Sequence, residues 1–223
     1  MKAGVDPAWG VADKSESRLP ASLAIVAALA LYVTLPEHLT MGPRWIVPGL
    51  ELALLVPLLI VAPRREHDEG RGLRVAAVVL IAIINAANVA SLVLLVRYLT
   101  TPGNRANGLD LLASSAAIWF TNVIVFALWY WELDRGGPHQ RLTSTHREPD
   151  FLFPQMVTPK SAPDGWVPAF IDYLFVSFTN ASAFSPTDTM PLTVAAKSLF
   201  MVQAGTSLLT VVLVAARAVN VLS

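Results

Sequence analysis

Residues 75–98 read VAAVVLIAIINAANVASLVLLVRY, an almost wholly apolar stretch whose one charged side chain is Arg97. A helix needs about 20 mostly apolar residues to cross the hydrocarbon core of a bilayer. Val75–Tyr98 meets this requirement in both length and composition. The stretch therefore predicts a membrane-spanning helix.

The composition of the whole chain points the same way. Of its 223 residues, 54% are apolar and 14% are charged, whereas about 25% are charged in soluble domains. The 16 basic and 16 acidic residues balance to zero net charge, so we expect no electrostatic attraction to nucleic acid. There is no cysteine, which excludes disulfides, thiolate metal sites and cysteine nucleophiles. We expect an all-α integral membrane protein whose first partner is the lipid bilayer.

Further apolar segments divide the chain into regions. They are Leu19–Pro36, Trp45–Ala62, Leu109–Trp131, Trp166–Ser182 and Leu192–Leu222. We expect a polar N-terminal tail at 1–18, a four-helix transmembrane bundle at 19–131, a linker at 132–165 and a C-terminal module at 166–223. In the linker, the apolar run 151–154 is interpreted as part of a partly ordered loop, with a docking element as the alternative. The aromatic cluster 129–131 is typical of rings at headgroup level, the alternative being packing between helices.

Two features bear on topology. Basic residues gather in the N-terminal tail, in residues 64–74 and in the linker, and the positive-inside tendency places these regions in the cytoplasm. Trp166–Ser182 is at the lower limit of a spanning length, so it either crosses the membrane or dips in and returns. The re-entrant path is favoured, because Ser177, Thr179 and Asn180 are poor lipid-facing residues.

Residues 172–193 read DYLFVSFTNASAFSPTDTMPLT, and this segment resembles the pore loop of the potassium-channel superfamily. In that family a short helix runs into Thr-Val-Gly-Tyr-Gly-Asp and then a proline. The resemblance aligns the filter-like turn with Ser182, Ala183, Phe184, Ser185, Pro186, Thr187 and Asp188. It implies a pore helix, a long inner helix at Leu192–Leu222, and assembly about an axis as a homotetramer, with the channel orientation placing the linker outside the cell.

The turn departs from a potassium filter in its glycines. Ser185 and Thr187 replace both glycines, and Pro186 fixes φ and removes a donor. We therefore expect no potassium-type ladder of carbonyls. A hydroxyl-rich turn remains, and four copies of Asp188 would form a ring that attracts cations. The alternative is an ordinary turn in which Asp188 caps the next helix.

A longer part of the chain is similar to a family of uncharacterised bacterial membrane proteins. The resemblance rests on the loop RREHDEGR at 64–71, on Gly136-Gly137, on FLFP at 151–154 and on the pore-like segment. It implies a multi-pass protein of the bacterial cell membrane.

Other polar residues lie within the apolar segments. Glu51 belongs to an ion or proton path or, as favoured, is a protonated or interface-reaching side chain. Asn85 and Asn88 share one helix face, and helix packing is favoured over a substrate site. Gln203, Ser207 and Thr210, with Thr206 alongside, form one stripe of the last helix. The channel resemblance favours pore lining for this stripe, with interhelical hydrogen bonding as the alternative.

These observations predict passive permeation of an ion, most simply a cation, through a filter of non-potassium type. No enzyme motif, metal-ligand spacing or cofactor fingerprint is present in the sequence. Two alternatives remain: a non-conducting scaffold or accessory subunit that lost its filter, and a small-solute carrier that uses Glu51 and the Asn85/Asn88 face.

Overall fold

The computed structural model describes residues 18–43, 45–61, 71–102, 108–142, 148–158, 163, 166–182 and 189–222. Helices account for 81% of the structure, so the all-α prediction is confirmed. The α-helices are α1 (Leu19–Val33), α2 (Ile46–Val61), α3 (Arg71–Thr100), α4 (Gly108–Leu133), α5 (Pro154–Val157), α6 (Phe170–Ser182) and α7 (Val194–Leu222). The shorter elements are η2 (Glu37–Leu39), η4 (Asp134–Gly136), η5 (Gln140–Leu142), β1 (Phe151–Leu152) and β2 (Met190–Pro191).

Three helices are long and apolar enough to cross a membrane, within Gly72–Thr100, Gly108–Gly136 and Val194–Ala215. Their length and composition indicate a membrane protein. The apolar helices α1 and α2 are shorter. Helix α1 ends before the predicted Pro36, because a proline disfavours helical geometry at the residue before it.

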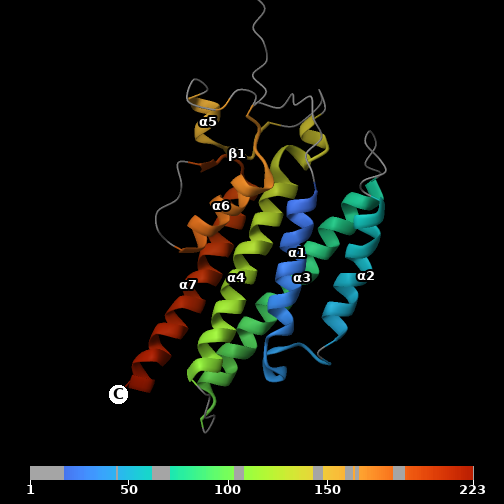
Figure 1. The fold of residues 1–223 in the computed structure, drawn as a ribbon. Helices are drawn as coiled ribbons and strands as arrows, with labels where there is room; N and C mark the ends of the chain where they lie inside the picture. The colour runs from blue at the N-terminus through green and yellow to red at the C-terminus, as the bar shows by residue number, and fades with distance from the viewer. Residues whose placement is uncertain are drawn as a thin grey trace, which may run out of the picture.

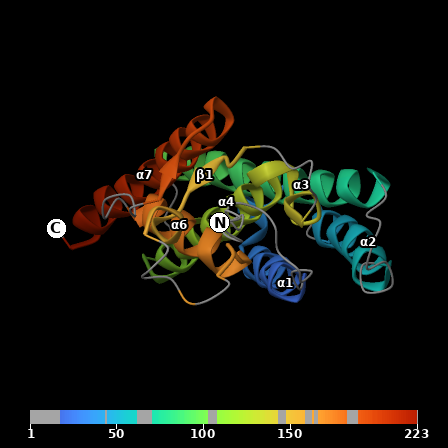
Figure 2. The ribbon, with the colours of Figure 1, turned by 90° about the horizontal axis from the view of Figure 1, so that it is seen from above.

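The long helices lie side by side around α4, which is the central element (Figures 1 and 2). Helix α4 packs against α1, α3, α6 and α7, whereas α2 packs on α3 and α1. Of the apolar window of α4, 67% is buried, but only 17% of that of α7. Helix α7 is therefore a peripheral helix of the bundle.

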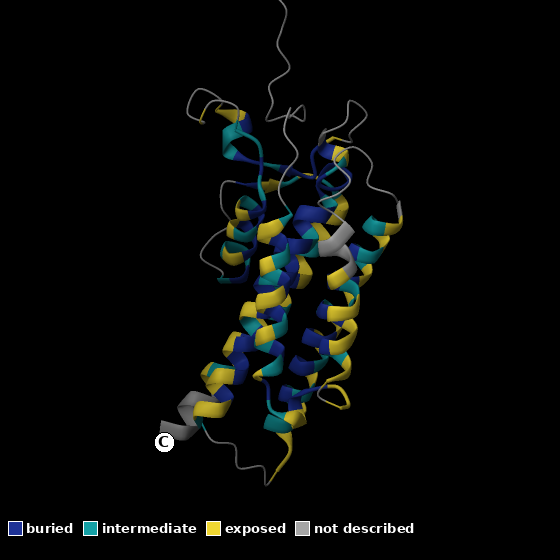
Figure 3. Cartoon of the chain, turned by 45° about the vertical axis from the view of Figure 1, so that its right-hand side comes forward, coloured by how far each residue is buried: buried dark blue, intermediate teal, exposed yellow. Residues whose placement is uncertain are grey.

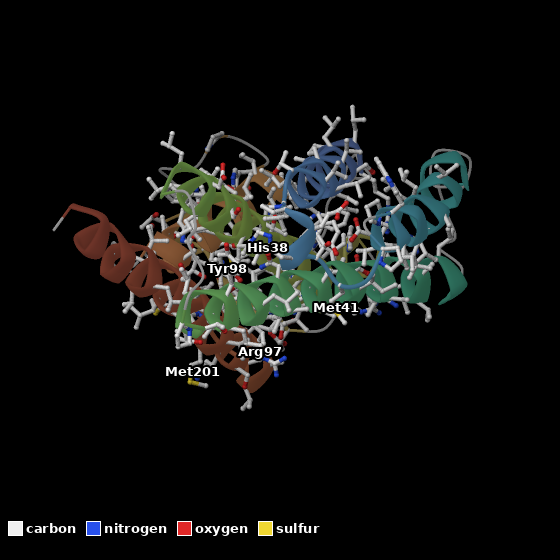
Figure 4. All side chains as sticks on the ribbon, turned by 90° about the horizontal axis from the view of Figure 1, so that it is seen from below. His38, Met41, Arg97, Tyr98 and Met201 are labelled. Atoms are coloured by element: carbon white, nitrogen blue, oxygen red, sulfur yellow. The ribbon has the colours of Figure 1, made fainter. Side chains whose placement is uncertain are left out.

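The turn between α1 and α2 closes one end of the bundle, which we call the far end. Here the His38 ring of η2 lies 4.4 Å from the Tyr98 ring of α3, between ring centroids (Figure 4). At the other end, the linker end, β1 pairs antiparallel with β2, with Phe151 opposite Pro191.

Two hydrophobic cores fill the bundle. The linker-end core includes Ile25, Leu55, Ile84, Phe126, Tyr173 and Ala196. The far-end core is formed by Tyr32, Ala87, Leu92, Leu111 and Ile118, with Val47 and Leu213 packed against it. Both cores draw on α1, α3 and α4, so they are stacked along the helices.

Polar side chains separate the two cores. In α2, Glu51 lies between Val47 at the far-end core and Leu55 in the linker-end core. The same order recurs along α4, with Thr121 and Asn122 between Ile118 and Val125, and along α7, with Gln203, Ser207 and Thr210 between Ala196 and Leu213. On α3, Asn85 follows Ile84 of the linker-end core, whereas Asn88 and Ser91 lie among the far-end-core residues Ala87 and Leu92.

Helix α6 covers only half of α4 and runs antiparallel to it. The Tyr173 hydroxyl donates to Asp134 Oδ2 just beyond the end of α4, at 2.6 Å. Further along, the Ser177 hydroxyl donates to the Val123 carbonyl at 2.6 Å, and the Phe178 ring packs edge-on against Trp119. Beyond the hairpin, β2 lies beside β1 at the linker end again. Residues 170–191 therefore start and finish at the same end of the bundle.

Candidate functional site

The hairpin between α6 and β2 carries the segment with predicted filter residues. Ser182 is the last residue of α6, and its hydroxyl donates to the Phe178 carbonyl at 2.8 Å. The predicted filter residues Ala183, Phe184, Ser185, Pro186, Thr187 and Asp188 lie outside the described residues. The described contacts are those of α6, the helix that precedes this segment.

Gln203 of α7 is the centre of a network of hydrogen bonds that joins α6 to α7 and α4. Its side-chain Nε2 donates to both the carbonyl and the hydroxyl of Ser177, at 3.0 and 2.6 Å. Its Oε1 accepts from the Tyr130 hydroxyl and, at 2.8 Å, from Asn180 Nδ2. Asn180 Nδ2 also donates to the Phe200 carbonyl at 3.1 Å. One amide group thus ties α6 to α7 and α4.

Ser207 holds the end of α6. The last four carbonyls of a helix have no partner within the helix. Ser207 donates its hydroxyl hydrogen to one of them, the Ala181 carbonyl, and accepts a hydrogen bond from Trp119 Nε1 at 2.7 Å. The polar end of α6 is thereby satisfied between α4 and α7.

The polar stripe of the last helix faces the interior of the bundle. Gln203, Ser207 and Thr210 are all at most 2% exposed, while Thr206 is partly exposed. For Gln203 and Ser207 the side-chain contacts are interhelical hydrogen bonds, and the Thr210 hydroxyl donates to its own helix at Thr206. Side chains that line a pore between subunits would face outward from each chain, whereas these three face the interior of this one. Gln203 and Ser207 form hydrogen bonds to other helices, as in the alternative that the sequence left open.

The opposite face of α7 is exposed. It includes Met201, which is 69% exposed and points away from the bundle (Figure 4). The period of the stripe was predicted correctly, but periodicity alone does not say which face meets the rest of the protein.

A second set of hydrogen bonds to α6, which the sequence analysis did not identify, lies at the linker end and includes Tyr173 and Arg141. The Tyr173 hydroxyl, which donates to Asp134, accepts from Arg141 Nη1 at 2.9 Å. The same nitrogen donates to the Trp131 carbonyl at 2.9 Å. Asp134 and Tyr173 are fully buried, so losing one of these contacts would leave a buried polar group unpaired at a cost in stability.

Asp150 completes this support, which we call the linker clamp: Asp134, Arg135, Arg141, Asp150, Tyr173 and Thr193. Asp150 Oδ2 accepts from the Arg135 backbone N–H at 3.1 Å, and Oδ1 accepts from the Thr193 hydroxyl at 2.6 Å. The Asp150 carbonyl accepts from the Leu192 N–H at 2.8 Å. The clamp therefore joins the end of α4, the linker and the start of α7.

Arg135 adopts a left-handed backbone conformation with φ 55°. Such a conformation is uncommon for a residue other than glycine. The buried arginine is held there by the Asp150 bond and by Asp134, whose Oδ2 lies 3.5 Å from Arg135 Nε. A signal did exist in the sequence, since the acidic Asp134 and the basic Arg135 and Arg141 lie close to Gly136-Gly137, but their pairing depends on the fold.

The apolar run 151–154 packs inside the protein. Phe151 and Phe153 are buried. Their rings contact Tyr130 and Tyr173, with centroid distances of 5.2 Å for Phe151–Tyr130 and 5.4 Å for Phe153–Tyr173. These rings hold this part of the linker against α4 and α6. Burial of Tyr130 and Trp131 likewise favours packing between helices over a headgroup position.

Glu51, Asn85 and Asn88 lie away from the hairpin, on α2 and α3. Glu51 is 1% exposed and Asn88 3% exposed. Glu51 Oε2, Asn85 Oδ1 and Asn88 Nδ2 have no hydrogen-bond partner within the described part of the chain. Among the described residues, no group of three or more His, Cys, Asp or Glu is arranged to hold a metal.

Comparison of the chain with protein-family models, with curated proteins and with solved structures finds no match. The functional conclusion therefore rests on the chain's own geometry.

Proposed function

We propose that this protein forms a membrane channel for cations, with the segment 182–188 lining the ion path. The observation that carries the proposal is the half-length helix α6, which enters beside α4, together with β2, which lies at the linker end again. At membrane depth, a non-helical turn is tolerated only where protein buries it or where it lines water. A hairpin tip that follows such a helix suits an aqueous path.

The length of α6 supports a re-entrant path. Its 13 residues extend about 20 Å at 1.5 Å per residue, less than the roughly 30 Å of the hydrocarbon core. The proposed topology has five crossings. Helices α3, α4 and α7 are long enough to span, and the shorter α1 and α2 are counted because each contacts both cores, whereas α6 contacts only the linker-end core. In this topology the linker and the start of α7 share one side of the membrane.

The chemistry of the tip favours hydrated cations over a potassium-type filter. Ser185 and Thr187 stand where potassium filters have glycine, and Pro186 has no donor. Hydroxyls and the Asp188 carboxylate are left to interact with the ion. Rings of acidic side chains are one of the ways in which cation channels select.

In the proposed channel, further copies of the chain supply the rest of the pore wall. One hairpin does not enclose a pore, so the proposal includes a homotetramer in a bacterial cell membrane. Exposed residues run along α7 (Figure 3), including Val194, Met201 and Leu208. This face is available to neighbouring subunits and to lipid.

Flux into liposomes tests the proposal. The purified protein should pass Na⁺ or K⁺ down a gradient, and Asp188→Asn should lower this flux or weaken selection against anions while leaving the oligomer intact. The control is Asp110→Asn, which removes an exposed carboxylate at the far end of α4 and should leave the flux unchanged. A folded oligomer that passes no ion would overturn the channel proposal and favour a non-conducting scaffold.

A further inference from the structure

The linker holds the strand that follows the segment 182–188. Its strand β1 pairs with β2, and Leu152 lies opposite Met190 in this pairing. Directly after β2, Leu192 donates its N–H to the Asp150 carbonyl at 2.8 Å. The linker therefore fixes the register of the chain between the segment 182–188 and α7.

Asp150 is in turn fixed to the end of α4. Its N–H donates to Asp134 Oδ1 at 2.9 Å, and its Oδ2 accepts from the Arg135 N–H at 3.1 Å. Its carbonyl accepts from Leu192 and its Oδ1 accepts from Thr193. The backbone N–H, the carbonyl and both carboxylate oxygens of Asp150 are thus all in hydrogen bonds. Asp150 therefore sets the position of β2 relative to α4.

Thr193 extends this connection into α7. It precedes Val194, the first residue of α7, and its Oγ1 accepts from the Ala196 N–H at 3.2 Å. Such a bond is typical of an N-cap threonine. The same hydroxyl donates its hydrogen to Asp150 Oδ1 at 2.6 Å, so the carboxylate orients the cap. The start of α7 and β2 are therefore held by one residue.

The strand β2 and the proposed ion path are covalent neighbours. Thr189 alone separates β2 from the segment 182–188, and consecutive Cα atoms are about 3.8 Å apart. A shift of β2 therefore shifts the C-terminal end of that segment. Groups that bind or select a ligand need to be held to within about 0.5 Å by the residues that support them.

We infer that Asp150 and Thr193 are positioning residues of the ion path, which fix β2 and thereby control cation selection. The inference rests on the proposed function and adds to it two residues outside the segment 182–188. Neither residue needs to touch the ion. A purely structural pair would change the stability of the protein but leave the selectivity of each folded channel unchanged.

Reversal potentials in planar bilayers under a NaCl gradient test the pair, because a permeability ratio does not depend on how much protein is folded. We expect Thr193→Val to lower the cation-to-anion permeability ratio about fivefold, the equilibrium factor of one ordinary hydrogen bond. Asp150→Asn, which replaces one acceptor oxygen of the carboxylate, should lower the ratio as well. Thr193→Ser keeps the hydroxyl and should keep the wild-type ratio.

Leu95→Ala is the matched control for lost stability. Leu95 is fully buried in the far-end core, so its truncation leaves a cavity and destabilises the fold. Because it lies away from the linker end, this variant should keep the wild-type ratio.

A disulfide between β1 and β2 tests whether the position of β2 is what matters. Opposite residues of an antiparallel pair have Cα atoms about 4.5 to 5.5 Å apart, which suits a disulfide. In the Thr193→Val background, Leu152→Cys together with Met190→Cys should regain the wild-type ratio when oxidised and lose it when reduced.

The outcomes separate this inference from the proposed function. A wild-type protein that passes no ion, or that shows no preference for cations, would overturn the proposed function. A cation-selective wild-type channel whose ratio is unchanged in Thr193→Val and Asp150→Asn would overturn the inference alone. An equal fall in Leu95→Ala, or a ratio that stays low after oxidation of the cysteine pair, would overturn it too. Should Thr193→Val not fold, Asp150→Asn with the same cysteine pair decides by the same ratio.

Discussion

At the scale of single residues, Gln203 is the most connected side chain of the hairpin support. Its amide uses both donors and its oxygen in bonds to Ser177, Tyr130 and Asn180. Hydrogen bonds between transmembrane helices average about 0.6 kcal/mol each. Removing this amide breaks several such bonds and also leaves its buried partners unpaired, which adds their desolvation penalty.

Gln203→Leu is therefore expected to lower the free energy of unfolding by about 2 to 3 kcal/mol. The measurement is denaturation of the purified protein in mixed micelles. Thr206→Val is the control, because the Thr206 hydroxyl bonds only to the Val202 carbonyl of its own helix. Equal losses for the two variants would contradict the role assigned to Gln203.

In the linker clamp, Asp134 has the role that Gln203 has beside α6, since several polar groups contact its one side chain. It accepts from the Tyr173 hydroxyl and from the Asp150 N–H, and it lies 3.9 Å from Arg141 Nη1. Asp134→Ala leaves two buried arginines without this carboxylate, so we expect a loss of about 3 to 5 kcal/mol in the free energy of unfolding.

The matched control for Asp134→Ala is Asp110→Ala on α4, where the carboxylate is exposed in the first turn. Its loss removes only a helix-dipole interaction, worth about 0.3 to 1 kcal/mol. A loss at Asp134 no larger than at Asp110 would mean that the clamp adds nothing to stability.

At the scale of elements, α6 is short for reasons visible in its sequence. Pro168 keeps the preceding residues out of helical geometry. Asp172 then accepts the Ala169 N–H at 2.8 Å and stabilises the first turn. The clustered hydroxyls and amides of its second half need partners, which α4 and α7 provide. A helix of this length, polar at its end, suits a half-crossing better than a full one.

Single cysteines test this path, because the natural chain has none. With α6 re-entrant, Gln140→Cys and Val194→Cys should react with an impermeant thiol reagent from the same side of the membrane. Thr101→Cys, in the turn after α3, should react from the other side. If Val194→Cys instead reacted together with Thr101→Cys, α6 would be a full crossing.

At the scale of the whole molecule, the distribution of basic residues predicts an orientation in the membrane. Described arginines at the linker end include Arg18, Arg74, Arg135 and Arg141, whereas Arg97 lies toward the far end. The positive-inside tendency predicts that Gln140→Cys reacts only from the cytoplasmic side in sealed vesicles of known orientation. Reaction only from outside would contradict the charge rule and favour the orientation of a potassium-channel pore loop.

The sequence by itself determined the all-α class and the positions of the apolar segments. Both follow from local properties, since length and hydropathy govern whether a segment suits the bilayer. It also determined that Gln203, Ser207 and Thr210 share one helix face, because the helical period is fixed.

Only the tertiary structure decided where that face points and what the linker does. Periodicity marks a stripe but not its neighbour, so the sequence left both pore lining and interhelical bonding open for Gln203, which in the structure bonds to Ser177, Asn180 and Tyr130. Asp150 meets Asp134 and Thr193 across gaps of 16 and 43 residues, and such pairs form only when the chain closes. Burial in a low-dielectric interior then turns ordinary loop charges into the linker clamp, because there an unpaired charge costs far more than it does in water.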